Sequence, residues 1–302
     1  MKNLNEMISP NEEELKLFSL LPMDASFREG FEKTLNNGVR KFRDSTFVVS
    51  CLVRNCEDRL LKNIGWLTTI LQEAKDYRFI IYENDSEDLT PMLLRKLANE
   101  NDKILVTTET HGRKQYGPIR NAERTKNLAE YRNANLSVIQ DRFSDFDYTI
   151  VLDLDFEEFY ATSLMHSIGV MTSNDIDAIC GVAYQMKPFE YEGQTYHTVW
   201  NYDTWAYRPN TWLDLSRIVN VQGLPAYSEG WYNYCILPVG SEPYTVYSGF
   251  GGMAIYKNSQ YIQGKYSGGD CEHVLFHRSL NEANPNFLLA CNPSQITLMP
   301  YE

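Results

Sequence analysis

The chain has 302 residues, 43% of them hydrophobic, and its 28 basic and 40 acidic side chains give a net charge of −12. A chain of this size and composition can bury a large core as one α/β domain. The negative charge disfavours general binding to nucleic acid or to anionic membranes, so a phosphate-bearing ligand would need a local group of cations.

The sequence has no apolar run of about eighteen residues, and its first residues lack a basic start followed by an apolar stretch. We therefore expect no transmembrane segment and no secretory signal, and a cytoplasmic location, at most at the membrane periphery. The chain has no CxxC pair, which favours buried free thiols over a zinc site or a disulfide framework. The cysteines are Cys51, Cys56, Cys180, Cys235, Cys271 and Cys291.

Residues 1–44 are predicted to form a helical extension. Ser9-Pro10 together with Glu12 has the pattern of a helix start, and Asn37-Gly38 that of a helix end. The rest of the chain, 45–302, is predicted to form one domain with halves at 45–160 and 161–302.

The first half alternates strands and helices. A continuous apolar strand begins at Thr46, apolar residues then recur at helical spacing from Leu60 to Leu71, and strands follow at 79–84 and 103–107 with a helix from Thr90 between them. This order predicts a parallel sheet joined by right-handed crossovers. It is typical of a nucleotide-binding α/β unit.

Polar residues follow the first two predicted strands at their carboxyl ends, where open α/β sheets bind their ligands. We expect these residues to cradle the base and ribose of a nucleotide. They are Arg54, Glu83, Asn84 and Asp85.

The loop 108–122 and the helix predicted at 124–140 carry basic residues. The loop, with His111, Arg113, Lys114 and Arg120, could contact phosphates or simply be solvated. On the helix, Arg132 is a candidate for a phosphate or ribose contact, and its alternative is an ordinary salt bridge.

Two aspartates one residue apart, Asp153 and Asp155, lie at the leaving end of the apolar strand that begins at Tyr148. Two other such pairs, at 145/147 and 175/177, precede apolar runs and so lie at the entering ends of strands. Carboxylates two apart on a strand point to one side, so Asp153 and Asp155 can reach one Mg²⁺ or Mn²⁺. The alternative is a solvated acidic turn.

The second half is predicted to contain a helix at 163–171, a strand at 178–184 and then, up to residue 266, many aromatic side chains. Flat apolar faces with polar tips suit sugar rings, although aromatic side chains also fill cores. The segment YDTWAYR places Asp203 and Arg208 beside aromatic residues, as a ligand-binding lip would. The aromatic residues include Tyr191, Tyr196, Trp200, Tyr202, Trp205, Tyr207, Trp212, Trp231, Tyr232 and Tyr234.

A strand predicted at 244–257 is interrupted by Gly249, Gly251 and Gly252, which would allow close approach of a ligand or of another backbone.

The following segment, GGDCEHVLFH, contains two acids and two histidines. If it is helical, His273 and His277 share a face and either could be a third metal or phosphate ligand, while Glu272 could act as a base. The alternative is a helix capped by Asp270 with both histidines in the core.

The order of these motifs resembles nucleotide-sugar glycosyltransferases of the GT-A fold. More narrowly, YENDSEDLT, RTKNLAEYRN, YDTWAYR, SGFGGMAIYK and DCEHVLFH resemble the fungal capsule-associated α-mannosyltransferase family and its bacterial and viral relatives. The resemblance implies a single Rossmann-like GT-A domain with a mostly parallel central sheet, a nucleotide-sugar half and an aromatic-rich acceptor half.

The resemblance also implies the ligands. They would be a UDP- or GDP-sugar donor, Mn²⁺ or Mg²⁺ at Asp153 and Asp155, and a glycan or lipid-linked glycan acceptor in a pocket formed by the glycine segment (Gly251, Gly252) and Glu272.

In such chemistry a cation neutralises the departing diphosphate. An inverting reaction also needs a carboxylate base, for which Glu272 and Asp270 are candidates. A retaining reaction needs close packing of donor and acceptor or a nucleophile, for which Asp203 and Glu272 are candidates.

Two other functions remain to be weighed. A sugar-phosphate nucleotidyltransferase needs a glycine-rich loop after the first strand, where this chain has residues 54–58, RNCED. A non-catalytic glycan-binding protein on the same scaffold would be expected to lose the carboxylates.

Overall fold

The computed structural model describes residues 23–117, 119–212 and 237–300. The helix start predicted at Ser9-Pro10 lies outside the described residues, as do Trp231, Tyr232, Tyr234 and Cys235. No helix in these ranges is both long and apolar enough to cross a membrane.

Helices and strands alternate through the first half of the chain. The helices are α3 (Arg28–Arg43), α4 (Glu57–Leu71), α5 (Thr90–Glu100), α6 (Ala122–Arg142), α7 (Ala161–Asn174), α9 (Asn258–Tyr261) and α10 (Glu272–Ala283). The strands are β1 (Thr46–Val53), β2 (Asp76–Asn84), β3 (Ile104–Glu109), β4 (Tyr148–Asp153), β5 (Glu158–Phe159), β6 (Ala178–Tyr191), β7 (Gln194–Asn201), β8 (Tyr244–Thr245), β9 (Met253–Lys257) and β10 (Leu289–Leu298). The elements predicted for the first half are confirmed, with boundaries that differ by a few residues.

The strands form one mixed sheet in the order β3-β2-β1-β4-β9-β6-β10-β5. The first four strands pair in parallel, β9 is antiparallel to both of its neighbours, and β6 and β10 are again parallel. The predicted α/β class is therefore confirmed. Because β1, β2 and β4 are parallel, the residues that follow them meet at one edge of the sheet.

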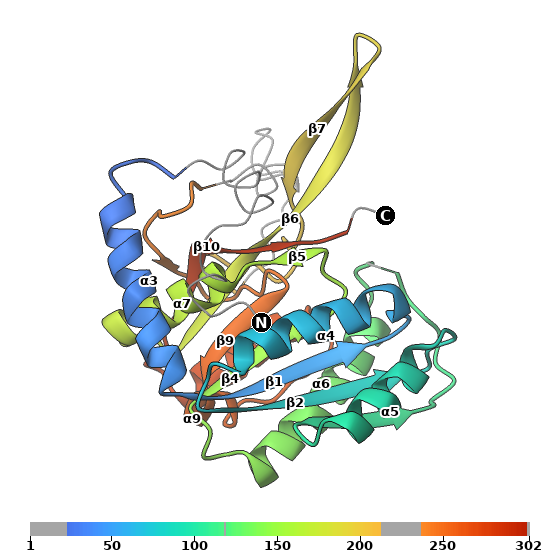
Figure 1. Ribbon diagram of the computed structural model, residues 1–302. Helices are drawn as coiled ribbons and strands as arrows, with labels where there is room; N and C mark the ends of the chain where they lie inside the picture. Colours follow the sequence, from blue (N-terminus) through green and yellow to red (C-terminus); the bar gives the residue numbers. More distant parts are fainter. Residues whose placement is uncertain (1–22, 118, 213–236, 301–302) are drawn as a thin grey trace.

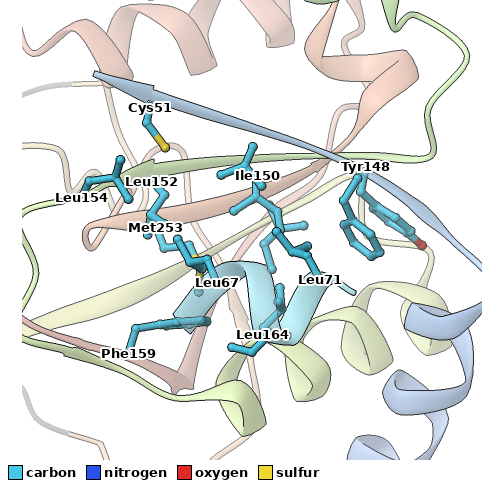
Figure 2. Close-up of a cluster of buried hydrophobic side chains, with 14 of the residues drawn as sticks. Cys51, Leu67, Leu71, Tyr148, Ile150, Leu152, Leu154, Phe159, Leu164 and Met253 are labelled. Atoms are coloured by element: carbon cyan, nitrogen blue, oxygen red, sulfur yellow. The ribbon is translucent and has the colours of Figure 1, made fainter. Parts of the chain in front are cut away.

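Helices cover both faces of the sheet (Figure 1), and a hydrophobic core fills the space under each layer. One core joins the sheet to α3, α4, α5 and α7, and Figure 2 shows part of it, with Ile150 and Leu152 of β4 among the side chains of α4 and α7. The other core joins the sheet to α6, α9 and α10. Burial on both faces explains why β1 is continuously apolar rather than alternating.

Side chains along β4 point alternately to the two faces of the sheet, and this alternation decides toward which face Asp153 points. Ile150 and Leu152 belong to the core under α4, whereas Val151 belongs to the core under α6 and α10. Asp153 follows Val151 on the same face. It therefore points toward the side of the sheet from which α6 and α10 contribute their side chains.

The predicted strand at 244–257 is wrong. The structure has a short β8 and a separate β9 with the glycine segment 248–252 between them. Gly251 and Gly252 have φ angles of 63° and 72°, which a regular strand cannot contain. A Cβ atom at Gly251 would lie 2.3 Å from the carbonyl oxygen of Gly181. Gly251 thus serves close backbone packing.

The part of the N-terminal extension that the structure describes packs on the domain. Helix α3 lies along α7, and Val39 and Phe42 enter the core with α4. The five described cysteines are buried free thiols, as predicted.

Candidate active site

A cavity of about 400 Å³ opens at the carboxyl ends of β1, β2 and β4. Its walls come from these strand ends, α6, the loop before α6, the segment after β7, the glycine segment and the start of α10. Among the lining residues are Arg54, Asn84, Lys114, Arg124, Arg132, Asp153, Asp155, Tyr202, Asp203, Trp205, Phe250, Gly252, Glu272 and His273. Many of the residues proposed from the sequence therefore meet in one place.

Asp153 ends β4 and Asp155 follows in a turn, and both line the cavity. The turn is held from α4, because the side-chain amide of Asn63 donates to the carbonyl oxygens of Leu154 (2.7 Å) and Phe156 (2.9 Å). Asn63 is buried, so this anchor is well protected from water. It fixes the backbone that carries the two carboxylates.

Arg132 of α6 is the central cation of the site, and only 4% of it is exposed. Its Nε donates to Glu272 Oε1 at 3.1 Å, and its Nη2 lies 3.4 Å from Asp153 Oδ1. Burial acts to lower the pKa of Arg132, but Glu272 and Asp153 raise it, so the guanidinium stays charged. It links the metal-site candidate on β4 to the base candidate on α10.

The glycine segment connects two further parts of the site. The amide of Gly251 donates to Asp203 Oδ2 at 2.8 Å, and the amide of Asp153 donates to the carbonyl oxygen of Gly252 at 3.0 Å. Burial raises the pKa of Asp203, while the hydrogen bond from Gly251 opposes the rise. The backbone of this segment thus sets the spacing between Asp203 and Asp153.

Basic side chains line the cavity in spite of the acidic chain. They are Arg54 after β1, Lys114 in the loop before α6, and Arg124 and Arg132 on α6. Arg124 also lies over the ring of Trp205, 6.0 Å from its centroid. Such a local group of cations is what an acidic protein needs to hold a diphosphate.

Several buried polar atoms at the cavity have no hydrogen-bond partner. They are Arg54 Nε, Arg132 Nη1, Trp205 Nε1 and both ring nitrogens of His273. Buried polar groups are normally satisfied, since leaving one unpaired costs about 1–3 kcal/mol. These atoms belong to residues of the cavity wall, and the described part of the protein leaves them without a partner.

The carboxylates of the cavity fit a divalent cation. Burial raises the pKa of Asp153 to about 7, with Arg132 opposing the rise and Asp155, Asp203 and Glu272 adding to it. The guanidinium of Arg132 lies buried beside Asp153 and Glu272, and a cation at Asp153 and Asp155 would further relieve the repulsion among the carboxylates. No cluster of three or more His, Cys, Asp or Glu side chains in the described ranges could hold a metal alone. Ligand oxygens and water would therefore complete the shell.

The prediction that His277 is a metal ligand does not agree with its surroundings. The residue is fully buried, Nδ1 is hydrogen-bonded with Ser248 Oγ (2.9 Å), and Nε2 is hydrogen-bonded with Tyr256 OH (2.8 Å). Neither nitrogen is left for a metal. Burial lowers the pKa of His277 to about 3, so the ring is neutral. The alternative weighed above, a histidine packed in the core, describes it better.

Asp270, proposed as a base, is also engaged elsewhere. Both of its carboxylate oxygens accept from Arg208 Nη2, at 3.1 and 3.0 Å, and Arg208 is completely buried. Arg208 Nη1 donates to the carbonyl oxygens of Trp205 and Tyr207. The ion pair holds the segment after β7 to the start of α10, and Asp270 does not line the cavity.

His273 does line the cavity, with its ring stacked on Phe250 at a centroid distance of 3.8 Å. Burial, Arg132 and His277 all lower its pKa well below the usual range, so the ring is neutral. Its Nε2 is 3.6 Å from Glu272 Oε1, beyond hydrogen-bond distance. Both ring nitrogens of His273 are buried without a hydrogen-bond partner, and its role as a third metal or phosphate ligand stays a prediction.

Arg54 and Asn84 line the cavity as predicted, but Glu83 and Asp85 do not. Glu83 is buried and accepts from the amide of Ser86. Asp85 adopts a left-handed conformation with φ 50°, and its Oδ1 accepts from the amides of His111 and Gly112. These two carboxylates shape the loops around this end of the cavity and do not line it.

The sequence interpretation missed two contributors. The first is Asn63, because a lone asparagine in an amphipathic helix has no signal that distinguishes it from a surface residue. The second is Phe250, which lies inside the glycine segment and stacks on His273; a single phenylalanine among glycines carries no signal of a role at a site.

Comparison with known proteins places most of the chain in one family. Residues 46–297 match the family model described as Cryptococcal mannosyltransferase 1. No curated protein sequence matches the chain significantly.

Solved structures give distant matches. They include S. aureus TarS 1-349 in complex with UDP-GlcNAc (12% identity over 85% of this chain and 59% of that chain, TM-score 0.45). GalNAc-T7 with UDP, GalNAc and Mn²⁺ matches at 11% identity over 93% of this chain and 54% of that chain, with a TM-score of 0.48. The mannosyltransferase PcManGT from Pyrobaculum calidifontis in complex with GDP-Man and Mn²⁺ matches at 11% identity over 90% and 66%, with a TM-score of 0.47. The chain thus spans between 54% and 66% of these three solved chains.

Proposed function

Because the chain belongs to the glycosyltransferase family described as Cryptococcal mannosyltransferase 1, we propose that it is a metal-dependent hexosyltransferase. It would move a hexose from a UDP- or GDP-sugar to a hydroxyl of a glycan or lipid-linked glycan. The observation that carries the proposal is the cavity at the carboxyl ends of β1, β2 and β4, where Asp153 and Asp155 face a group of arginine and lysine side chains.

The donor would lie across this sheet edge with its base near Arg54 and Asn84, the two strand-end residues that line the cavity. Lys114 and Arg124 would hold the diphosphate, since both are cations that line the cavity. Asp153 and Asp155 would hold Mn²⁺ or Mg²⁺, which when bound neutralises charge on the departing diphosphate. The sugar would then lie toward Asp203 and Glu272.

Glu272 is the carboxylate best placed to take the proton from the acceptor hydroxyl. It lines the cavity, whereas Asp270 is tied to Arg208. Arg132 holds one oxygen of Glu272 and so orients the carboxylate. His273 and Asp203 also line the cavity and would bind sugar hydroxyls.

The test is a screen of nucleotide sugars for Mn²⁺-dependent hydrolysis and transfer, followed by Asp155→Asn. The substitution removes one of the two carboxylates while keeping the size of the side chain, so we expect turnover to be abolished and metal-dependent binding of the nucleotide diphosphate to weaken at least about tenfold. Titration calorimetry with and without Mn²⁺ measures the binding.

The matched control is Asp145→Asn, which alters an exposed aspartate at the other end of β4. It should behave as the wild type, and both variants should unfold at about the wild-type temperature. Undiminished metal-dependent nucleotide binding in Asp155→Asn would remove the aspartate pair from the proposal.

A further inference from the structure

The hairpin of β6 and β7 extends beyond the body of the molecule (Figure 1). The strands pair from Tyr184–Asn201 to Tyr191–Gln194, and among the described strands β7 pairs only with β6. Glu192 and Gly193 form the two-residue turn with positive φ angles of 50° and 74°, as the right-handed twist of a hairpin favours. A two-stranded hairpin has little stability of its own. We therefore ask which interactions the side chains of this projecting hairpin could make.

The aromatic side chains of the hairpin gather on one face. Alternation puts residues 185, 187, 189 and 191 on one face with their partners 200, 198, 196 and 194. That face carries Phe189, Tyr191, Tyr196 and Trp200, with Lys187 4.0 Å above the ring of Trp200. The opposite face carries no phenylalanine, tyrosine or tryptophan beyond the buried Tyr184. Its other residues include Met186, Pro188, Glu190, Thr195, His197 and Val199. We call the first group the aromatic face.

The outer part of the aromatic face lies open to water. Phe189 is 47% exposed, Tyr196 43% and Tyr191 58%. Phe189 and Tyr196 stack at a centroid distance of 5.5 Å, which makes a flat platform. A contiguous exposed aromatic surface of this kind marks an interaction site more often than it serves stability.

The aromatic face leads into the cavity. Tyr202 follows Trp200 by two residues and its amide still donates to the carbonyl oxygen of Ala183, so the strand pairing continues to that point. Tyr202 is 39% exposed and lines the cavity beside Asp203. From Tyr196 to Tyr202 the strand spans roughly 20 Å. A ligand lying on the platform would reach the cavity at Tyr202.

We propose that the aromatic face binds the distal sugars of an extended glycan whose end enters the cavity as the acceptor. The inference rests on the proposed hexosyl transfer. Sugar rings offer CH patches to aromatic faces and hydroxyls to tyrosine tips and lysine. The outer edge of β7 adds backbone donors and acceptors, which hydroxyl groups can satisfy.

A lipid bilayer suits this surface less well. An open strand edge would leave backbone groups unsatisfied in hydrocarbon, and the net charge of −12 opposes attraction to anionic lipid. The aromatic face has no acidic residue and a single lysine, so a neutral polyhydroxylated chain is its best match in charge.

The experiment measures glycan binding by the full chain without donor or metal. Mannose, mannobiose and linear mannohexaose, with the corresponding glucose and galactose oligosaccharides, are titrated by saturation-transfer difference NMR. We expect a hexaose to bind at least about tenfold more tightly than its monosaccharide, because the distal sugars gain ring contacts.

The double variant Phe189→Ala/Tyr196→Ala removes the platform. It should abolish the advantage of the hexaose and leave binding of the monosaccharide unchanged. The matched control, Pro188→Ala/His197→Ala, alters a directly opposed pair on the other face and should keep wild-type binding. Circular dichroism and metal-dependent nucleotide binding show whether the variants are folded.

Hexaose binding that survives in the double variant, absence of a length dependence, or absence of binding to every oligosaccharide would overturn the proposal. So would platform-dependent binding to phosphatidylcholine vesicles or platform-dependent dimerisation, which would assign the face to a membrane or to a second copy. Because donor and metal are omitted, these results are independent of the transferase test above. Length-dependent glycan binding together with a failed nucleotide-sugar screen would contradict the proposed function and leave the glycan surface standing.

Discussion

Arg132 is the residue on which the charge balance of the cavity depends. It is the buried cation between Asp153 and Glu272, and it also lies 5.5 Å from the ring centroid of Phe250. Removing one partner from a buried ion pair is far more costly than the pair is worth, because a charge is left unpaired in a medium of low polarity. Substitutions at Glu272 must therefore be read with binding and stability measured alongside activity.

Glu272→Gln changes charge with little change in volume. If Glu272 takes the acceptor proton, the transition state for sugar transfer should lose about 2–5 kcal/mol of stabilisation, and kcat should fall accordingly. Binding of the donor nucleotide should persist, because it depends on Arg54, Lys114 and the aspartates. Steady-state kcat and KM together with the nucleotide Kd check this prediction.

Glu282→Gln is the control on the same helix, since Glu282 is exposed and pairs with the exposed Arg278 in an i,i+4 arrangement. It should leave kcat within about twofold of the wild type, as expected for a surface pair. Wild-type kcat in Glu272→Gln would mean that the proton is accepted elsewhere.

Among the helices in the described ranges, α3 and α7 contact each other most extensively. A Cβ atom at Gly38 of α3 would lie 1.7 Å from the carbonyl oxygen of Met165, and one at Gly169 of α7 would lie 2.1 Å from the carbonyl oxygen of Thr34. Each helix thus presents a glycine to the backbone of the other. Contact at this distance also stacks Phe31 on His166, with a centroid separation of 4.4 Å.

Gly38→Ala should push the two helices apart and lower the free energy of unfolding by about 1–3 kcal/mol, the usual cost of overpacking. Gly30→Ala is the matched control on the same helix. A Cβ atom there meets nothing within 4 Å, so the helix propensity of alanine should leave stability unchanged or raise it by up to about 1 kcal/mol. Urea denaturation of both variants measures the difference, and equal stabilities would show that α3 is not packed on α7 in this way.

At the scale of the whole molecule, buried histidines couple stability to pH. Burial lowers the pKa of His166 to about 4 and that of His277 to about 3, from a usual value near 6.5. Below pH 6.5 these histidines are protonated in the unfolded chain but not in the folded chain. Each histidine therefore lowers the free energy of unfolding as the pH falls toward its pKa in the folded protein. The slope is at most about 1.4 kcal/mol per pH unit for each residue.

His277→Gln should therefore flatten the acid side of the stability profile, even if it lowers stability at pH 7.5 by weakening the hydrogen bonds with Ser248 and Tyr256. Urea denaturation at several values between pH 7.5 and 4.5 gives the profile. The comparison of wild type and variant isolates this residue from carboxylates such as Asp153, whose raised pKa acts in the opposite sense. Parallel profiles would contradict the prediction.

The sequence by itself determined the layout of the first half and the position of the acidic pair. Local signals sufficed there: a continuous apolar run gives β1, helical spacing gives α4, and a strand that leads into Asp153 places it at the ligand-binding edge. Strand alternation and parallel pairing then bring Arg54 and Asn84 to the same edge.

Only the tertiary structure decided which partners the other charged and polar groups have. Arg132 forms an ion pair with Glu272, which lies 140 positions away in the sequence. Asp270 pairs with Arg208. Both ring nitrogens of His277 are hydrogen-bonded, to Ser248 and Tyr256. Periodicity reports which face of an element is apolar, but it carries no information on which distant side chain lies opposite. The role of a buried polar residue depends on that neighbour, since the neighbour decides whether the group is satisfied within the protein or left to bind a ligand.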